Sequence, residues 1–242
     1  MWDKLNDILG QTPLHPQYFV IKEQKEILNI TFPKLKGKVL DVGCGRQLLR
    51  KPITDLGCNY TSLDHPNIYR RQRAKEKPDI LADITKLPLS NNSYNSVLLF
   101  MVLPHLPNPS VGIKEINRIL KSNGLLFISA IENYPGHDLP DDYFRFRLKG
   151  LVSLCEYNGF KIIQKHSFGN FWIVNSLNFN VFLMQSAKFI LDKTGNNFLT
   201  GVLIVLFMPF IIISNISAII LSPLDIIKTT KLVNFLIAKK DA

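Results

Sequence analysis

The chain has 242 residues, of which 46% are hydrophobic and 20% are charged, and its formal net charge is +10. This length and apolar content exclude an intrinsically disordered protein and allow one domain to bury a full core. The three cysteines show neither metal-ligand spacing nor a disulfide framework, so we expect no metal site and a reducing cytoplasm. The amino-terminal residues lack the basic-then-apolar pattern of a secretory signal.

The first strongly patterned segment is residues 38–45, Lys-Val-Leu-Asp-Val-Gly-Cys-Gly. An apolar run that contains Asp41 breaks into a Gly-x-Gly turn, which predicts a buried parallel strand and a tight loop whose backbone approaches a ligand closely. The next predicted strand, residues 59–64, ends in Asp64. An acid at this distance from the turn is placed to bind the ribose hydroxyls of a nucleotide-like cofactor.

The same turn distinguishes between two cofactors. A nicotinamide fingerprint has a third glycine at the sixth position, which is Leu48 here, and it needs no acid just before the turn. S-adenosylmethionine has no phosphate, but it carries a cationic sulfonium and an amino group that Asp41 can complement. The pattern Asp41-x-Gly43-x-Gly45 therefore fits S-adenosylmethionine better than NAD.

The densest basic run, residues 70–77, follows the second predicted strand. It suits contact with nucleic acid, with anionic lipid or with a diphosphate-bearing substrate, and it equally suits a solvated helix face. Nucleic acid is the least favoured of these partners because no aromatic residue interleaves with the basic ones.

Further strands and a helix follow in the order of an α/β protein. A short strand that ends in an acid, a buried strand, a helix with one apolar face and another buried strand are predicted at residues 79–84, 96–103, 111–120 and 125–131. Lys-Ser-Asn-Gly at 121–124 predicts an Asn-Gly cap at the carboxyl end of that helix.

This order resembles the class I S-adenosylmethionine-dependent methyltransferases, in particular the type 11 methyltransferase domain. The resemblance covers roughly residues 12–170, and the matching stretches are 39–45, 80–89, 97–105 and 115–124. It implies a Rossmann-like α/β fold with a seven-stranded, mostly parallel sheet and an antiparallel last strand. Family members often have Gly, Asp and Glu where this chain has Gln47, Asn95 and Pro104, which removes some loop flexibility and an acid beside the substrate cleft.

The resemblance also implies a site for S-adenosyl-L-methionine. Asp83 and Ile84 are expected to border the adenine, because a carboxylate suits the exocyclic amine and an apolar side chain packs on the ring. Asp83 is alternatively a loop cap. The expected cofactor-binding residues are Asp41, Gly43, Cys44, Gly45, Asp64, His65, Asp83, Ile84 and Phe100.

The acceptor is expected after the fifth predicted strand, because ligands bind beyond the carboxyl ends of the strands. Residues 137–145 resemble the His-x-x-Pro-x-Asp-Tyr-x-Arg segment of a branch of these methyltransferases that occurs with surface-polysaccharide and other glycan enzymes. The segment at 15–19 also resembles that branch, in which it covers the cofactor.

Four residues are the catalytic candidates, each with an alternative role. His137 is expected to act as a base or to bind the acceptor, or to cap backbone groups of its loop. His105 is expected to face the cleft or to cap a helix. Arg145 is expected to bind an anionic acceptor or to pair with a neighbouring aspartate, and Tyr143 to line the site or to pack in the core.

A second feature is the apolar stretch at residues 199–221, which has no charge and almost no polar side chain. With its flanks it is long enough to cross a bilayer. A weaker apolar stretch lies at 171–191, and lysines flank both. A proline, Pro209, predicts a kink or a break in the middle of the first stretch.

The predicted strands at 160–166 and 232–240 would form the antiparallel hairpin that ends this fold, with residues 170–228 inserted between them. Because the final strand returns to the same sheet, a single membrane crossing is excluded. The insert is expected to dip in and out of a membrane as a helical hairpin or to lie in the interface as amphipathic helices. Core packing, with the insert covering the cleft, and a homodimer face are the alternatives.

The chain therefore divides into an amino-terminal helical lid at 1–36, a methyltransferase core at 37–169, the insert at 170–228 and the final strand at 229–242. We expect a methyltransferase at the inner face of the cell membrane, peripheral or monotopic, that acts on a glycan, a lipid-linked sugar or another lipid-like acceptor. The alternatives are a quinone-like or RNA methyltransferase and a non-catalytic membrane-associated protein that binds S-adenosylmethionine.

Overall fold

A computed structural model describes residues 10–72 and 76–241, and the chain divides into two compact units. The sheet unit comprises residues 28–132, 136–167 and 234–242, and the helical unit comprises residues 1–27, 133–135 and 168–233. Each unit is built from segments that lie far apart in the sequence, so neither could be delimited by one cut in the chain.

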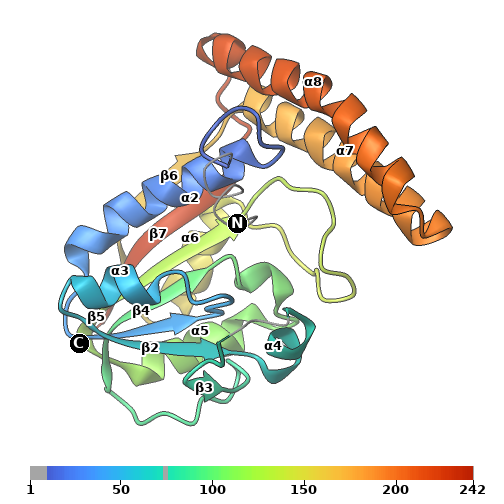
Figure 1. Cartoon of the computed structure of the whole chain (residues 1–242). Coiled ribbons are helices and arrows are strands. Elements are labelled where there is room, and N and C mark those ends of the chain that lie inside the picture. The colour runs from blue at the N-terminus through green and yellow to red at the C-terminus, as the bar shows by residue number, and fades with distance from the viewer. Residues whose placement is uncertain (1–9, 73–75, 242) are drawn as a thin grey trace. The chain divides into compact units, whose positions relative to one another are not determined.

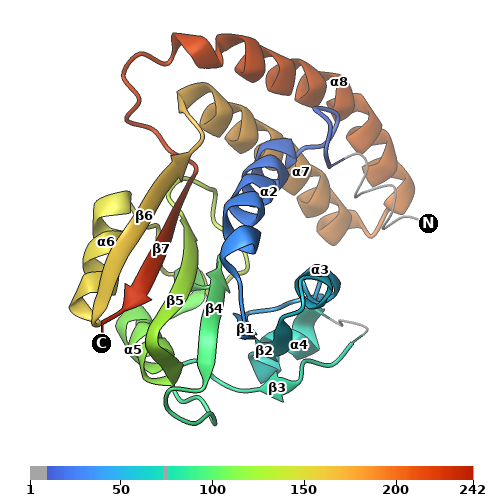
Figure 2. The ribbon, with the colours of Figure 1, turned by 90° about the vertical axis from the view of Figure 1, so that its left-hand side faces the viewer.

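The sheet unit contains a seven-stranded sheet in the order β3-β2-β1-β4-β5-β7-β6 (Figure 2). Its parallel strands are β1 (Lys38–Val42), β2 (Asn59–Asp64), β3 (Ile80–Leu81), β4 (Tyr94–Phe100) and β5 (Leu120–Ile131). The last strands, β6 (Phe160–Phe168) and β7 (Val233–Lys240), run antiparallel. The predicted fold class is thereby confirmed, including the helical segment between the last two strands.

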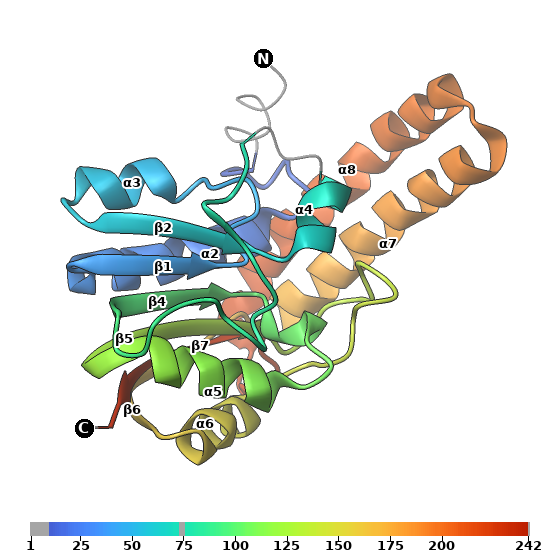
Figure 3. The same cartoon turned by 90° about the horizontal axis from the view of Figure 1, so that it is seen from below.

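Helices of the sheet unit pack on the strands through regularly spaced apolar residues. They are η1 (Phe32–Lys34), α3 (Arg50–Asp55), α4 (Pro66–Gln72), η2 (Leu103–His105), α5 (Pro109–Ile119) and α6 (Leu148–Tyr157), and α2 (Tyr18–Thr31) leads into them. In α5 the fully buried residues Ile113, Ile116 and Ile119 recur every third position, which places them on one face. Figure 3 shows α5 and α6 together on one side of the sheet.

Two predicted boundaries were wrong near α5. The helix ends at Ile119, and Lys121 to Gly124 belong to β5 instead of forming a helix cap. Leu120 already has the extended angles φ −68 and ψ 140 and pairs with Tyr94. The left-handed Asn123, at φ 63, lies where the register between β4 and β5 shifts. Its conformation therefore serves a strand irregularity and not a helix end.

Two strands are also shorter than the sequence predicted. The strand expected at 79–84 is limited to β3 at Ile80–Leu81, and the one expected at 96–103 ends at Phe100. Met101 has a φ of 59, which an extended strand does not accommodate, and the 3-10 helix η2 begins directly afterwards.

The helical unit is an antiparallel pair, α7 (Phe171–Thr194) and α8 (Asn197–Leu221), followed by η3 (Ser222–Leu224) (Figure 1). Local signals define both ends of the turn between them. Gly195 has a φ of 64 and ends α7, and the Asn196 side chain accepts the backbone N–H of Leu199 at the start of α8. The helix α8 continues through Pro209, so the expected break is absent, and the alternative kink stays a prediction.

Polar side chains of the helical unit are gathered between α7 and α8. Asn215, fully buried on α8, accepts hydrogen bonds from Asn180 and Ser176 of α7 at 2.8 and 3.1 Å. Its amide donates to the backbone carbonyls of Pro13 and His15 at 2.8 and 3.0 Å. These hydrogen bonds hold the segment that precedes α2 against the helix pair, and they satisfy polar groups that are buried between the two helices.

Candidate functional site

The backbone of the glycine loop after β1 lies close to two other segments, the end of β2 and the side chain of Val102. The N–H groups of Gly43 and Cys44 both donate to the carbonyl of Leu63 in β2, at 2.8 and 3.1 Å. Gly43 has a φ of 73, and a Cβ there would lie 2.4 Å from Cγ2 of Val102. Gly45 has a φ of 50. Gly43 is thus required by the backbone of a loop that lies at the carboxyl edge of the sheet, and Gly45 suits the positive φ of its position.

Gln47, where family members often have glycine, shows why a glycine suits this position. Its φ is 55, in the left-handed region, and its side chain is almost fully buried. The Gln47 amide oxygen accepts Nε of Arg50 at 3.0 Å, and the amide nitrogen donates to the carbonyl of Glu76 at 3.2 Å. These bonds anchor the glutamine, so the loop keeps its conformation without the glycine.

Asp41 and Asp64 are both 4% exposed and lie at this loop. Tyr60 donates its hydroxyl hydrogen to Asp41 Oδ2 at 2.6 Å, which favours the ionised carboxylate. Burial nevertheless raises the pKa of Asp41 to about 6, and the negative charge of Asp64 adds to the rise. The carboxylate is therefore destabilised, and a cationic ligand in the loop would relieve it.

Asp64 ties the loop to the end of β2. Its Oδ2 accepts the backbone N–H of Gly45 at 2.9 Å, and its Oδ1 accepts that of His65 at 2.7 Å. Burial raises the pKa of Asp64, while these two N–H groups act in the opposite direction. The predicted ribose-binding acid thus also holds the glycine loop, a role that the sequence did not indicate.

The remaining expected cofactor residues differ in their surroundings. Burial raises the pKa of the Cys44 thiol to about 12, so it stays protonated at neutral pH. His65 is half-buried, and its Nδ1 accepts the N–H of Asn67 at 3.3 Å. Phe100 is half-buried at the end of β4, with its ring 6.3 Å from that of Phe235.

Asp83 has the loop-capping contacts that the sequence left as an alternative. Its Oδ1 accepts both the N–H and the hydroxyl of Thr85, each at 2.8 Å. Ile84 is 5% exposed and packs in the hydrophobic core beside Gly112. In this structure Ile84 therefore faces the core, and its packing on an adenine ring stays a prediction.

The catalytic candidates come together in the loops after β4 and β5. The rings of His105 and His137 meet edge to face with their centroids 5.2 Å apart. Nδ1 of His105 lies 2.7 Å from the carbonyl oxygen of Asp141. The N–H groups of Tyr143 and Phe144 donate to the carbonyl of Pro104, so the two loops are joined through their backbones.

Asp142 organises the second of these loops. Its side chain is 4% exposed, and it accepts both terminal nitrogens of Arg145 and the backbone N–H of His137 at 3.0 Å. The Arg145 guanidinium holds the pKa of Asp142 well below its usual range. Arg145 therefore has the pairing that we considered as an alternative to acceptor binding. Tyr143 is exposed and does not pack in the core.

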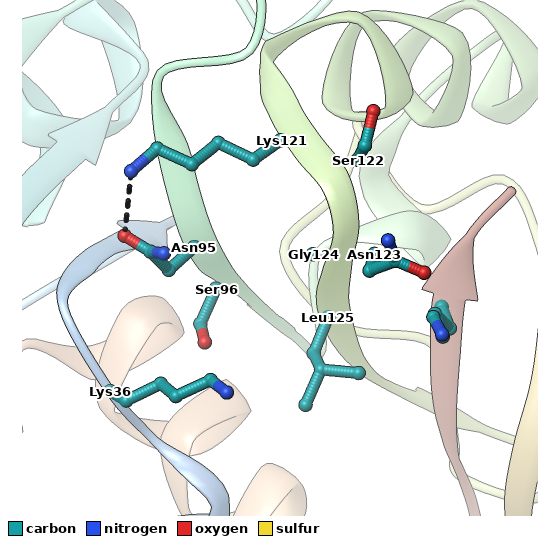
Figure 4. Close-up of a pocket in the computed structure, with 9 residues that line it drawn as sticks. Lys36, Asn95, Ser96, Lys121, Ser122, Asn123, Gly124 and Leu125 are labelled. Atoms are coloured by element: carbon teal, nitrogen blue, oxygen red, sulfur yellow. Dashed lines mark hydrogen bonds between the residues drawn. The ribbon is translucent and has the colours of Figure 1, made fainter. Parts of the chain in front are cut away.

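A hollow of about 400 Å³ opens at the other edge of the same sheet (Figure 4). It is bordered by Lys36, the first residues of β4, and the bulged part of β5 at 121–125. Asn95, which replaces a common aspartate, accepts the N–H of Lys38 and the ammonium of Lys121 there. Because parallel strands separate this edge from the glycine loop, the change at Asn95 does not touch the cofactor side.

Asp142 belongs to the motif recognised at 137–145, and its bonds to His137 and Arg145 lie within that segment. Two other residues that position this site were not singled out from the sequence, namely Tyr60, which donates to Asp41, and Val102, which lies against Gly43. Their positions give no local signal, because each acts on a residue of another segment. Tyr60 is the exception in part, since it lies in the strand that ends in Asp64.

The comparisons with known proteins agree with the geometry of the loop. Residues 40–128 match a family described as a methyltransferase domain. The ubiquinone biosynthesis O-methyltransferase of Pelagibacter ubique is 27% identical over 142 residues, which are 54% of this chain and 59% of that protein. The demethylmenaquinone methyltransferase of Renibacterium salmoninarum is 28% identical over 121 residues, which are 49% and 51%. The chain spans about half the length of the curated relatives it matches.

Solved structures share the fold over most of the chain. The cyclase SpnF aligns with a TM-score of 0.56 and 18% identity over 91% of this chain and 80% of that one. Phosphoethanolamine N-methyltransferase 2 of Haemonchus contortus, in complex with S-adenosyl-L-methionine, aligns with a TM-score of 0.52 and 16% identity over 91% and 53%. Identities this low show the fold alone, and the fold does not determine the reaction.

The contact between Gly43 and Val102 gives a test of the loop. Gly43→Ala should abolish calorimetric binding of S-adenosylmethionine, because its Cβ would collide with Cγ2 of Val102. Gly57→Ala is the matched control, since Gly57 has a φ of 78 with no atom within 4 Å of the added carbon. Both changes cost about 1 kcal/mol of backbone strain. Adding Val102→Ala to Gly43→Ala should restore part of the affinity; equal binding by both alanine variants would contradict this account.

Proposed function

We propose that this chain, whose residues 40–128 match a methyltransferase domain, is a class I S-adenosylmethionine-dependent methyltransferase and that it methylates a quinone-like, membrane-held acceptor. The observation that carries the proposal is an outward-facing apolar helix pair attached to this domain. The curated relatives named as ubiquinone and demethylmenaquinone methyltransferases support the acceptor class. A phenolic oxygen or a ring carbon of such an acceptor would receive the methyl group.

The cofactor side of the proposal rests on Asp41 and Asp64. Asp41 is ionised at neutral pH at a cost set by its burial and by its acidic neighbour. S-adenosylmethionine brings a sulfonium and an ammonium group, so it supplies the positive charge that this loop lacks. Asp64, fixed by two backbone N–H groups, is expected to accept the ribose hydroxyls with the remaining lone pairs of its two oxygens.

The reaction is a displacement at the methyl carbon. The carbon–sulfur bond breaks with its electron pair going to sulfur, and the acceptor oxygen forms the new bond after losing its proton. Alignment of the two reactants supplies much of the rate, and a phenolic acceptor also needs a group that takes the proton. His105 and His137 are the imidazoles next to each other at this edge of the sheet, and we assign that step to their site.

The membrane part of the proposal begins with α8. The most apolar 18-residue window of the segment from Asn197 to Leu224 has a mean hydropathy of 2.5, and only 17% of this window is buried. Large apolar side chains recur at three- and four-residue intervals along it and are exposed to solvent: Leu199, Val202, Leu206, Phe210, Ile213, Ile216 and Ile220. This spacing puts them in one stripe, whose exposure to water is unfavourable by about 25 cal/mol per Å².

The helix pair buries several polar side chains between its helices and exposes many large apolar ones. Ser176, Asn180 and Asn215 face one another between the helices, while the stripe faces outward. Interhelical hydrogen bonds with an apolar exterior are the arrangement that a lipid environment requires. The helix pair therefore suits contact with lipid better than contact with water.

The polar turn of the pair favours an in-plane position over deep insertion. Asp192, Lys193 and Asn196 lie at this turn, and ionised groups are costly in the hydrocarbon core. Because β6 and β7 belong to one sheet, both ends of the helix pair also stay on one side of the bilayer. We propose a monotopic anchor at the cytoplasmic membrane face that lies in the interface with its stripe toward the acyl chains.

A second acceptor class has one specific observation in its favour. The segment from His137 to Arg145, which resembles that of glycan-associated methyltransferases, forms an organised loop around Asp142 beside His105. A lipid-linked glycan is therefore the second candidate, and it too would be held at a membrane.

Transfer of an isotope-labelled methyl group tests the acceptor class. With the full chain in mild detergent, we expect label in a polyprenylated phenol and none in a lipid-linked glycan or RNA. Label in the glycan alone would overturn the quinone-like assignment. Absence of label in every acceptor, with calorimetric binding of S-adenosylmethionine intact, would favour the non-catalytic alternative. Asp64→Asn should lose both binding and transfer, while Asp55→Asn, on the exposed end of α3, should keep both.

The pKa of Asp41 gives a pH-dependence. Since S-adenosylmethionine is cationic, it binds the ionised form, and its affinity should be constant above about pH 6 and fall as the pH drops through that value. Tyr60→Phe removes a hydrogen bond to the carboxylate, so it should move this midpoint upward by roughly one to two pH units. Calorimetric titrations between pH 5 and pH 8 (about the range over which the protein is stable) measure both midpoints. Tyr157→Phe, with an exposed ring, should leave the midpoint unchanged.

Vesicle flotation tests the anchor. Leu206→Glu with Ile213→Glu places two charges in the exposed stripe without removing a buried contact, so bound protein should fall roughly tenfold or more. Leu56→Glu with Tyr157→Glu adds the same charge at exposed apolar positions of the sheet unit and should bind like the wild type. If the wild-type chain is a dimer in the absence of detergent while the stripe variant is a monomer, the stripe is a dimer face instead.

A further inference from the structure

Three side chains with metal-binding atoms converge in the loops after β4 and β5. One such atom from each of His105, His137 and Asp138 lies within 4.8 Å of those of the other two. They form a candidate group for holding an ion within residues 10–72 and 76–241. His105 and His137 are far apart in the chain, so the parallel sheet and not sequence spacing brings them together.

One of the two histidines, His105, also has the outer partner that a metal-binding imidazole needs. Nδ1 of His105 lies 2.7 Å from the Asp141 carbonyl oxygen, which can only accept, so Nδ1 carries the hydrogen and Nε2 keeps a lone pair. Nδ1 of His137 lies 3.7 Å from the Asp142 carboxylate, which is too long for a hydrogen bond. In metal sites the outer nitrogen of a ligating histidine is held by a carbonyl or a carboxylate, as Nδ1 of His105 is here.

Asp142 is itself fixed, so it can orient His137. It is 4% exposed, paired with both terminal nitrogens of Arg145, and bonded to the backbone N–H of His137. Its negative charge is balanced by Arg145, which leaves Asp138 to supply the negative charge among the three inner groups. Asp138 is exposed, and its backbone has a φ of 54 in the turn that its carbonyl closes with the N–H of Asp141.

We propose that His105, His137 and Asp138 bind a divalent transition-metal ion of the Zn²⁺ type and leave one coordination position open. Two imidazoles and one carboxylate with an open position form a ligand set that zinc enzymes use. A tetrahedral Zn²⁺ at 2.0 to 2.2 Å from its ligands needs them about 3.3 Å apart, so an ion would draw the three atoms together by roughly an ångström. The exposed carboxylate of Asp138 gives the site room for this adjustment.

The open position assigns a chemical role that rests on the proposed function. The site lies at the carboxyl edge of the sheet that carries the glycine loop, where an acceptor hydroxyl is expected. A hydroxyl oxygen bound to the ion loses its proton at neutral pH, which makes it a better nucleophile for the methyl carbon. In the loaded protein the two imidazoles then act as ligands, and the released proton goes to water.

The cysteines of the sheet unit are poorly placed to compete for the ion, because Cys58 and Cys155 are buried and none of the three belongs to a cluster of metal-binding side chains among the described residues. Burial raises the pKa of Cys44 and of Cys155 to about 12 and also raises that of Cys58. A metal-binding cysteine must be a thiolate. Binding of a transition metal to the folded chain should therefore report on the histidine–aspartate group.

Titration of the metal-stripped full chain with Zn²⁺ and Co²⁺ tests the site without S-adenosylmethionine or acceptor. We expect one ion per chain with at least roughly 100-fold weaker binding in His105→Ala and in His137→Ala, and about 10-fold or more in Asp138→Asn. Asp141→Asn is the matched control, because it removes the same charge from the same loop while keeping the backbone carbonyl that His105 contacts. Its affinity should equal that of the wild type.

Two outcomes would overturn the proposal. One is wild-type binding no tighter than about millimolar, and the other is Zn²⁺ binding that survives both histidine changes. The acceptor role is tested apart from this, by adding a nitrocatechol to the Co²⁺-loaded chain and following the visible spectrum of the ion. An unchanged spectrum would contradict the open coordination position, while the proposed metal site would stand. Binding of S-adenosylmethionine should be unchanged in His105→Ala and Asp138→Asn. A loss of this binding would show that the variant has damaged the cofactor site and not only the metal site.

Discussion

The burial of two carboxylates at neighbouring strand ends is the constraint on which the cofactor side of this protein depends. The two carboxylate oxygens of Asp64 accept the backbone N–H groups of Gly45 and His65, and these bonds hold the glycine loop. Asp41 lies beside it with a pKa raised to about 6 by burial and by the charge of Asp64. Two buried like charges are unfavourable in an empty loop and favourable around a cation, which supports the proposed cofactor site.

The helix pair of α7 and α8 buries polar side chains and exposes a stripe of apolar ones. Its amide and hydroxyl groups bond to one another and to the carbonyls of Pro13 and His15, and its apolar stripe is left outside. Water does not favour that distribution, whereas a lipid interface does. If the proposed anchor and the proposed acceptor are both held at a membrane, they share one plane, and the search for the substrate would be confined to it.

Local patterns predicted several elements well because each depends on residues within one segment. The alternation that ends in Asp64 predicted β2 at its observed bounds, and the Gly-x-Gly turn predicted the positive φ at Gly43 and Gly45. The Asn-Gly pair at 123–124 misled, because a left-handed asparagine suits a helix cap and a strand irregularity equally. Pairing of Leu120 with Tyr94 decided between them, and that pairing is a contact between distant segments.

The sequence by itself determined the class of the fold, the cofactor loop with its two acids, and the position of the apolar insert. These are features of hydrophobic period, glycine placement and length, which act within a few residues. The tertiary structure alone decided that Arg145 pairs with Asp142, that Ile84 enters the core, and that His105 meets His137 and Asp138. Such contacts follow from the order of the strands in the sheet, which brings the ends of β4 and β5 together and which no local pattern encodes.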